Sequence, residues 1–98
     1  MWGFVLINMI TVYVLESLKD GVHYTGMAKD VTSGLREHNS GKNRFTKGHL
    51  PWKIIYTEEH ETWKEARVRE KYLKTNAGKL WVKKFLELNG GKAGSLPA

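Results

Sequence analysis

The stretch "ITVYVLESLKDGVHYTGM", residues 10–27, decides the fold that we predict for this chain. Its two ends, residues 10–16 and 22–27, are rich in β-branched and aromatic residues, which is typical of strands. Asp20-Gly21 lies between them, and this dipeptide is a strong signal for a two-residue hairpin turn. We therefore predict an antiparallel hairpin that turns at Asp20-Gly21.

The predicted turn determines which side chains share a face of the hairpin. A two-residue turn pairs Ser17 with Tyr24 and Leu15 with Gly26. Because side chains alternate along a strand, Tyr13 shares a face with Leu15 and therefore with Tyr24. We expect these two tyrosines, from different strands, to reach the same volume.

Each later element has its own start signal. Asp30 is a typical helix cap, Thr62 opens a T-x-x-E capping box, and Asn76 is placed to cap a last helix. We predict helices over residues 30–39, 62–75 and 78–88, and a third strand over residues 52–59. The resulting order, β-β-α-β-α-α, indicates the α+β class, with a small antiparallel sheet flanked by helices.

The length of 98 residues indicates a single domain. We assign residues 10–89 to this domain, residues 1–9 to an N-terminal extension, and the Gly/Ser/Pro-rich residues 90–98 to a flexible tail. The apolar N-terminus contains Asn8, is shorter than the ~20 residues that span a bilayer, and lacks the basic leader of a signal peptide. We therefore expect no membrane association.

The chain has no cysteine, which excludes a disulfide framework, a thiol nucleophile and a thiolate zinc site. This composition fits a reducing compartment, and we predict a cytoplasmic protein. The four histidines lie 15, 11 and 11 residues apart, which matches no zinc-site spacing. We therefore expect no histidine metal cluster.

The charge points toward a polyanionic partner. Sixteen Lys and Arg against ten Asp and Glu give a net charge of +6, and nucleic acid is the commonest partner of so basic a domain. Many small intracellular domains are also basic without such a partner. The loop "GKNRFTKGH" suits phosphates plus a stacked base, or is an ordinary solvated loop; its candidate nucleic-acid contacts are Lys42, Arg44, Lys47 and His49, interleaved with Phe45.

Glu70 is a carboxylate on what should be an apolar face. On a helix from Thr62 it falls within about 20° of Trp63, on the stripe that should meet the sheet. A carboxylate there is costly unless it is paired or bound to a cation. Two interpretations stay open, namely a salt bridge to a nearby Lys or Arg, and a ligand for a hard divalent ion such as Mg²⁺.

The helix predicted over residues 30–39 carries a glycine in its middle and a histidine near its end. Gly34 costs roughly 0.5–1 kcal/mol relative to Ala in such a position. His38 follows four residues later and therefore lies on the same helix face as Gly34. Val31 and Leu35 flank this face, so we expect His38 to lie near the sheet, as a structural histidine or as part of a site.

Five motifs, in order and at matching spacing, resemble those of the GIY-YIG nuclease superfamily, in particular its small single-domain bacterial members. They are "VYV" at 12–14, "YTG" at 24–26, "EHNSG" at 37–41, "TKGHLPWKIIY" at 46–56 and "AxxREKYLK" at 66–74. The resemblance runs from about residue 10 to residue 88. It implies an enzyme that hydrolyses phosphodiester bonds in DNA with the help of one divalent ion, Mg²⁺ or Mn²⁺.

The resemblance also implies roles for four residues. Tyr13 would deprotonate the attacking water, Tyr24 would support Tyr13 by hydrogen bonding, and His38 would assist at the scissile phosphate. Glu70 would hold the metal. A free tyrosine has a pKa of about 10, so nearby cations and a metal-bound phosphate would have to favour its ionised form.

The chain departs from the family pattern at Gly34, where the family normally has an arginine that reaches the phosphate. Arg36 lies about 160° around the helix from His38, so we predict that it does not substitute. Three explanations stay open. The chain is a weakened nuclease, or Lys47 or Arg44 supplies the charge, or it is a nucleic-acid-binding module that lost most of its chemistry.

The expected partner is DNA, bound by its structure or without sequence preference, because no recognition domain is visible. The oligomeric state is left open by the sequence. A weaker alternative is a protein-interaction domain that uses the apolar N-terminal residues 1–8.

Overall fold

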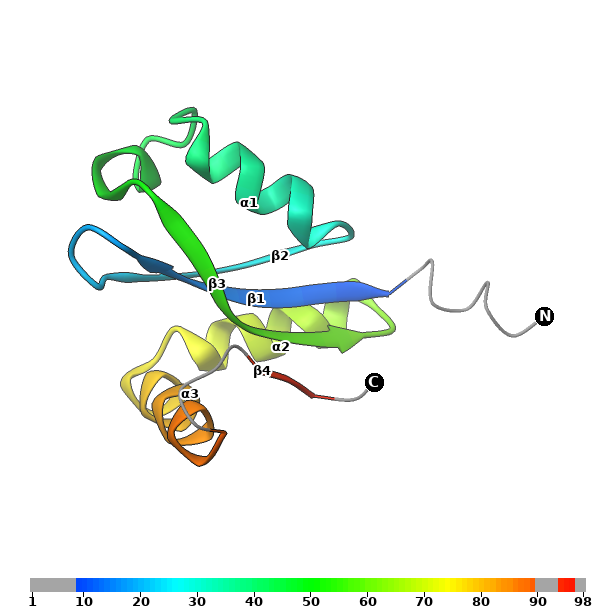
Figure 1. Ribbon diagram of the computed structural model, residues 1–98. Coiled ribbons are helices and arrows are strands. Elements are labelled where there is room, and N and C mark those ends of the chain that lie inside the picture. The colour runs from blue at the N-terminus through cyan, green and yellow to red at the C-terminus, as the bar shows by residue number, and fades with distance from the viewer. Residues whose placement is uncertain (1–8, 90–93, 97–98) are drawn as a thin grey trace.

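The computed structural model describes residues 9–89 and 94–96 and contains one sheet with helices on both faces. The strand order is β2-β1-β3-β4, and Figure 1 shows α1 on one face of the sheet and α2 and α3 on the other. The predicted α+β class and the order β-β-α-β-α-α are confirmed. The strands are β1 (Ile10–Ser17), β2 (His23–Ala28), β3 (Trp52–His60) and β4 (Gly94–Leu96); the helices are α1 (Val31–Asn39), the 3₁₀ helix η2 (Thr46–His49), α2 (Trp63–Leu73) and α3 (Asn76–Leu88).

The β1–β2 hairpin forms, but its predicted register is wrong by two residues. Leu15 pairs with Tyr24 and Tyr13 pairs with Gly26, so the loop has four residues rather than two. The hydroxyl of Ser17 explains the longer loop, because it accepts hydrogen bonds from the backbone N–H groups of Lys19 and Asp20. An even shift leaves every side chain on its predicted face, and Tyr13 and Tyr24 do share one.

The two faces of the sheet bury two separate clusters. Ile10, Val12 and Val14 of β1 pack with residues of α2 and α3 on one face. Tyr13 and Leu15 point the other way and pack under α1. The alternation of β1 therefore places Tyr13 on the α1 side of the sheet.

Two of the three predicted helix caps are confirmed. The Asp30 side chain accepts from two backbone N–H groups of α1, and Thr62 accepts from Glu65 N–H of α2. The Asn76 cap is wrong, since Thr75 caps α3 and α2 already ends at Leu73. A Cβ on Gly78 would collide with the end of α2, so the two helices approach closely and the chain must leave α2 early.

Residues 94–96, within the predicted tail, form β4, which pairs in parallel with Tyr56–Glu58 of β3. The sheet is therefore mixed rather than wholly antiparallel. Residues 1–8, 90–93 and 97–98 lie outside the described residues, so the predicted extension and most of the tail stay predictions. In the described part of the chain, no helix is long and apolar enough to cross a membrane.

The Tyr13 ring packs directly over the backbone of Gly26, where no larger residue fits without movement of the ring. A Cβ at Gly26 would lie 2.7 Å from the Tyr13 hydroxyl oxygen and 3.1 Å from the Tyr24 ring. We expect Gly26→Ala to lower the free energy of unfolding by about 1–3 kcal/mol, because the ring must move out of a packed cluster. Urea denaturation measures this change.

Gly48→Ala is the matched control, since a Cβ there meets nothing within 4 Å. Equal stability of the two variants would show that the Tyr13 ring is free to move away from Gly26.

Candidate active site

The phenol of Tyr13 lies between two elements that each offer a glycine. β2 passes beneath it at Gly26, and α1 covers it at Gly34, where a Cβ would lie 3.4 Å from the hydroxyl oxygen. The hydroxyl lies 3.2 Å from Nε2 of His38, one helical turn after Gly34. Tyr13 is only 4% exposed, so these neighbours set the chemistry of its oxygen.

The imidazole of His38 is held on three sides. Its Nε2 meets Tyr13, its Nδ1 lies 3.0 Å from Oγ1 of Thr46, and its ring centre lies 4.5 Å from that of Tyr24. Thr46 is fully buried, and its carbonyl accepts a hydrogen bond from Trp52 Nε1 at 2.9 Å. The structure therefore brings together Tyr13, Tyr24 and His38, which the sequence placed in one site.

A cavity of about 360 Å³ opens beside this group. Gly34 forms part of its wall, next to the Tyr13 hydroxyl, so the missing side chain leaves room there. The Tyr13 phenol and the His38 imidazole both line this cavity. Its lining residues are Tyr13, Met27, Ala28, Asp30, Ser33, Gly34, Glu37 and His38.

The surroundings of Tyr13 oppose its ionisation. Burial, followed in order of effect by Tyr24, Glu37 and Glu70, raises the pKa of the Tyr13 phenol to about 12. Burial lowers the pKa of His38, so its imidazole is neutral near pH 7. A protonated phenol beside a neutral imidazole is a weak base until a positive charge arrives.

Glu70 lies on α2, across the sheet from α1, and does not line the cavity. It is 9% exposed, and its oxygens lie 3.2 Å from Lys74 Nζ and 3.7 Å from Arg67 Nε. Both cationic side chains are more than half exposed, so water reaches this ion pair. Its link to the site is electrostatic, because its charge contributes to the raised pKa of Tyr13.

The salt bridge that the sequence left open for Glu70 is therefore present. Within the described residues, no three His, Asp or Glu side chains gather as a metal-binding group. A single buried carboxylate with exposed counter-ions suits a hard cation that keeps water and substrate oxygens as its other ligands. Glu70 stays a predicted metal ligand on this ground.

The basic loop borders the site through Phe45. This ring is 53% exposed, and its centre lies 6.1 Å from that of Tyr24. His49, by contrast, is bound to Asp20 of the hairpin loop at 2.6 Å and also packs against Phe45. The three cations of this loop are exposed, namely Lys42, Arg44 and Lys47.

Arg36 is exposed and is not among the residues that line the cavity, as the helix geometry predicted. Thr46 and Glu37 were missed by sequence reasoning. Glu37 lines the same cavity as His38. Its position directly before His38 in the sequence is the signal that could have found it. Thr46 reaches the site only through the fold, and no local pattern marks it.

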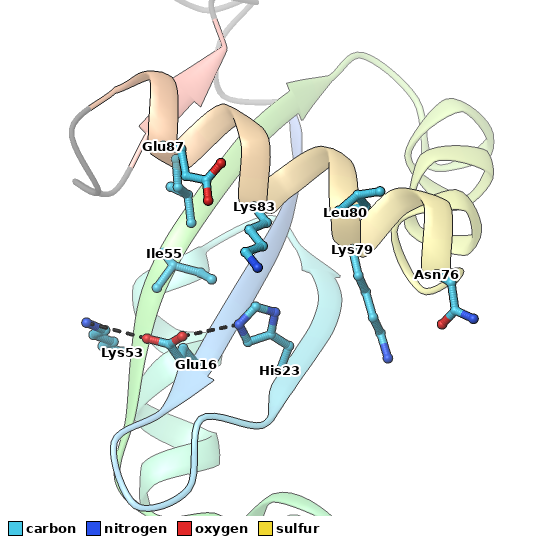
Figure 2. Close-up of a pocket in the computed structure, with 10 residues that line it drawn as sticks. Glu16, His23, Lys53, Ile55, Asn76, Lys79, Leu80, Lys83 and Glu87 are labelled. Carbon is cyan, nitrogen blue, oxygen red and sulfur yellow. Dashed lines mark hydrogen bonds and ion pairs between the residues drawn. The ribbon is translucent and has the colours of Figure 1, made fainter.

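A second cleft, of about 560 Å³, lies between α3 and the end of the sheet (Figure 2). The Glu16 carboxylate lines this cleft, and it is paired with His23 at 3.3 Å and with Lys53 at 3.6 Å. The Glu16 carboxylate is therefore already paired, and no tyrosine is among the residues that line this cleft. The Tyr13 cavity is the better candidate for a catalytic centre.

Comparison with known proteins identifies the family of this chain. The model of the GIY-YIG catalytic domain matches residues 9–84. The chain belongs to the GIY-YIG family. The UPF0213 protein of Staphylococcus aureus (strain Mu3 / ATCC 700698) is 42% identical over 65 residues, which cover 65% of this chain and 78% of that protein.

The UPF0213 protein SA0446 of Staphylococcus aureus (strain N315) is similar to the same extent and with the same coverage. The solution NMR structure of the UPF0213 protein BH0048 from Bacillus halodurans is 31% identical, with a TM-score of 0.49. The match covers 85% of this chain and 87% of that one. A GIY-YIG domain makes a nuclease-type function the coarse expectation for this chain.

The lowered pKa of His38 predicts that acid destabilises the fold. As pH falls below about 6.5, the unfolded chain binds a proton at this imidazole before the folded chain does. The free energy of unfolding therefore falls as pH drops from about 7 toward 5. We expect His38→Gln to show a shallower fall, measured as the melting temperature across this range.

Equal slopes in the two proteins would mean that other groups account for the acid sensitivity.

Proposed function

We propose that this chain is a divalent-metal-dependent endonuclease that hydrolyses phosphodiester bonds in DNA. The observation that carries the proposal is the cluster of Tyr13, Tyr24 and His38, in which Tyr13 and His38 line one cavity, in a chain of the GIY-YIG family. Tyrosine and histidine at hydrogen-bond distance are suited to proton transfer. The net charge of +6 suits a polyanionic substrate.

In this proposal Tyr13 accepts the proton of the attacking water, and Tyr24 and His38 fix its position. The cavity beside Gly34 admits the scissile phosphate to the phenol. Mg²⁺ or Mn²⁺, held by Glu70, would stabilise negative charge that builds on phosphate oxygens. Exposed cations of the loop at 42–47 bind the flanking phosphates, and Phe45 offers a face on which a base can stack.

The absence of a cationic side chain at position 34 predicts slow turnover. Removing one positioned stabiliser of transition-state charge typically lowers the rate by about 10²–10³. The substrate is DNA selected by its structure, or without selection, rather than by base sequence.

Cleavage assays on plasmid and branched DNA with Mg²⁺ or Mn²⁺ test the proposal. We expect Tyr13→Phe and Glu70→Gln each to lower the rate at least about 10²-fold, because one removes the base and the other a metal ligand. Glu65→Gln is the matched control, since it makes the same change at the exposed start of the same helix. Removal of the divalent ion by EDTA should stop cleavage.

The raised pKa of Tyr13 favours a second candidate, a binding module without turnover. In that case the wild type and the Tyr13→Phe and Glu70→Gln variants would show the same background in the cleavage assay. Their DNA affinities would also be equal and would fall steeply with salt.

Gly34→Arg tests whether the missing charge limits the rate. A Cβ at this position meets Tyr13 at ordinary contact distances of 3.4–3.7 Å, so the side chain can extend along the cavity. We expect a rate increase of about tenfold or more, because a cation beside the phenol and the phosphate stabilises both anions.

Gly48→Arg is its control, because it adds the same charge to the basic loop, where a Cβ meets open space. An equal gain from both variants would reflect DNA affinity alone. No gain from Gly34→Arg would mean that another cation fills the role.

A further inference from the structure

Thr46 lies behind the site, on the side of His38 away from Tyr13. It is fully buried, and its backbone is anchored at both ends. Its N–H donates to Asn43 Oδ1 at 3.0 Å, and its carbonyl accepts from Trp52 Nε1 at 2.9 Å. Its hydroxyl is thereby held 3.0 Å from Nδ1 of His38.

The direction of the Thr46–His38 hydrogen bond follows from the hydroxyl proton. A buried hydroxyl must donate its proton to an acceptor or lose about 1–3 kcal/mol. Within the described residues, Nδ1 of His38 is the only hydrogen-bond partner of Thr46 Oγ1. The hydroxyl therefore donates, and Nδ1 accepts.

This direction determines which ring nitrogen carries the proton. A neutral imidazole with an accepting Nδ1 has its hydrogen on Nε2. Nε2 lies 3.2 Å from the Tyr13 oxygen, so His38 donates to that oxygen. The Tyr13 proton is then free to point into the cavity, and a donor on the oxygen stabilises the phenolate.

We propose that Thr46 is a positioning residue that holds His38 as the Nε2–H tautomer, so that His38 donates a hydrogen bond to the Tyr13 oxygen. Its catalytic consequence rests on the proposed function, whereas the tautomer itself does not. The other ionisable groups around the pair are Tyr24 on β2, Asp30 and Glu37 at α1, and Glu70 on α2. None of these is hydrogen-bonded to the imidazole in the described residues.

The first experiment reads the tautomer directly in the protein without DNA. We expect ¹⁵N NMR of labelled histidine to show the Nε2–H form of His38 in the wild type and in Thr46→Ser. In Thr46→Val, which keeps the shape but removes the donor, a mixture of tautomers should appear. An Nδ1–H form in the wild type, or an unchanged Nε2–H form in Thr46→Val, would overturn the proposal.

The second experiment measures the consequence for cleavage. We expect Thr46→Val to lower kcat on the order of tenfold with little change in KM. Loss of a hydrogen-bond partner that orients a functional histidine has effects of this size in metal sites. Thr46→Ser should restore most of kcat. Thr25→Val makes the same change at a buried threonine on the opposite face of the sheet and should leave kcat unchanged.

The two experiments separate the two proposals. An Nε2–H tautomer that depends on Thr46, in a protein that never cleaves DNA, contradicts the nuclease and supports the positioning role. Cleavage that is equally fast in the wild type and Thr46→Val contradicts a catalytic role for Thr46 and leaves the nuclease intact.

Discussion

The crossing of the Tyr13 ring over Gly26 is the contact on which the site depends. The pairing of these residues across β1 and β2 places a ring where a Cβ would lie 2.7 Å from its oxygen. Only glycine leaves that space, and only this register brings it opposite Tyr13. The phenol is then held against β2 at Gly26, where α1 covers it and His38 contacts its oxygen. Strand register thus determines the position of the Tyr13 oxygen.

Much of the fold was predictable, because caps and alternation are local properties. Asp30 and Thr62 cap their helices, as their side-chain chemistry predicts. The alternation of side chains along the two hairpin strands placed Tyr13 and Tyr24 on one face of the sheet. The loop length was not predictable, since the Ser17 hydroxyl competes with the Asp20-Gly21 turn. The error in the predicted register left the site unchanged only because a shift of two residues keeps every side chain on the same face of the sheet.

The parts of the site that were missed depend on contacts between distant segments. Thr46 meets His38 because η2 folds back under α1, and no spacing along the chain encodes this approach. Outside the site, the same holds for Glu58 of β3, which is 3% exposed and accepts a hydrogen bond from Arg69 Nε at 2.7 Å on the other face of the sheet. Helix periodicity correctly marked Glu70 as buried. It could not show that Lys74 and Arg67 would pair with it.

The charges around Tyr13 disfavour its ionised form, so the phenol needs a nearby cation to act as a base. Every charged group that shifts the pKa of this phenol raises it, although the chain as a whole is basic. A phosphate that enters the cavity brings more negative charge, which opposes ionisation further. The phenol can therefore act as a base only when a cation enters with the phosphate. Gly34 leaves open space beside the phenol, and its helix cost of roughly 0.5–1 kcal/mol is small beside the effect of a positioned charge. In the proposed mechanism, the protein alone thus holds the Tyr13 phenol protonated, and a cation that arrives with the substrate would favour its ionisation.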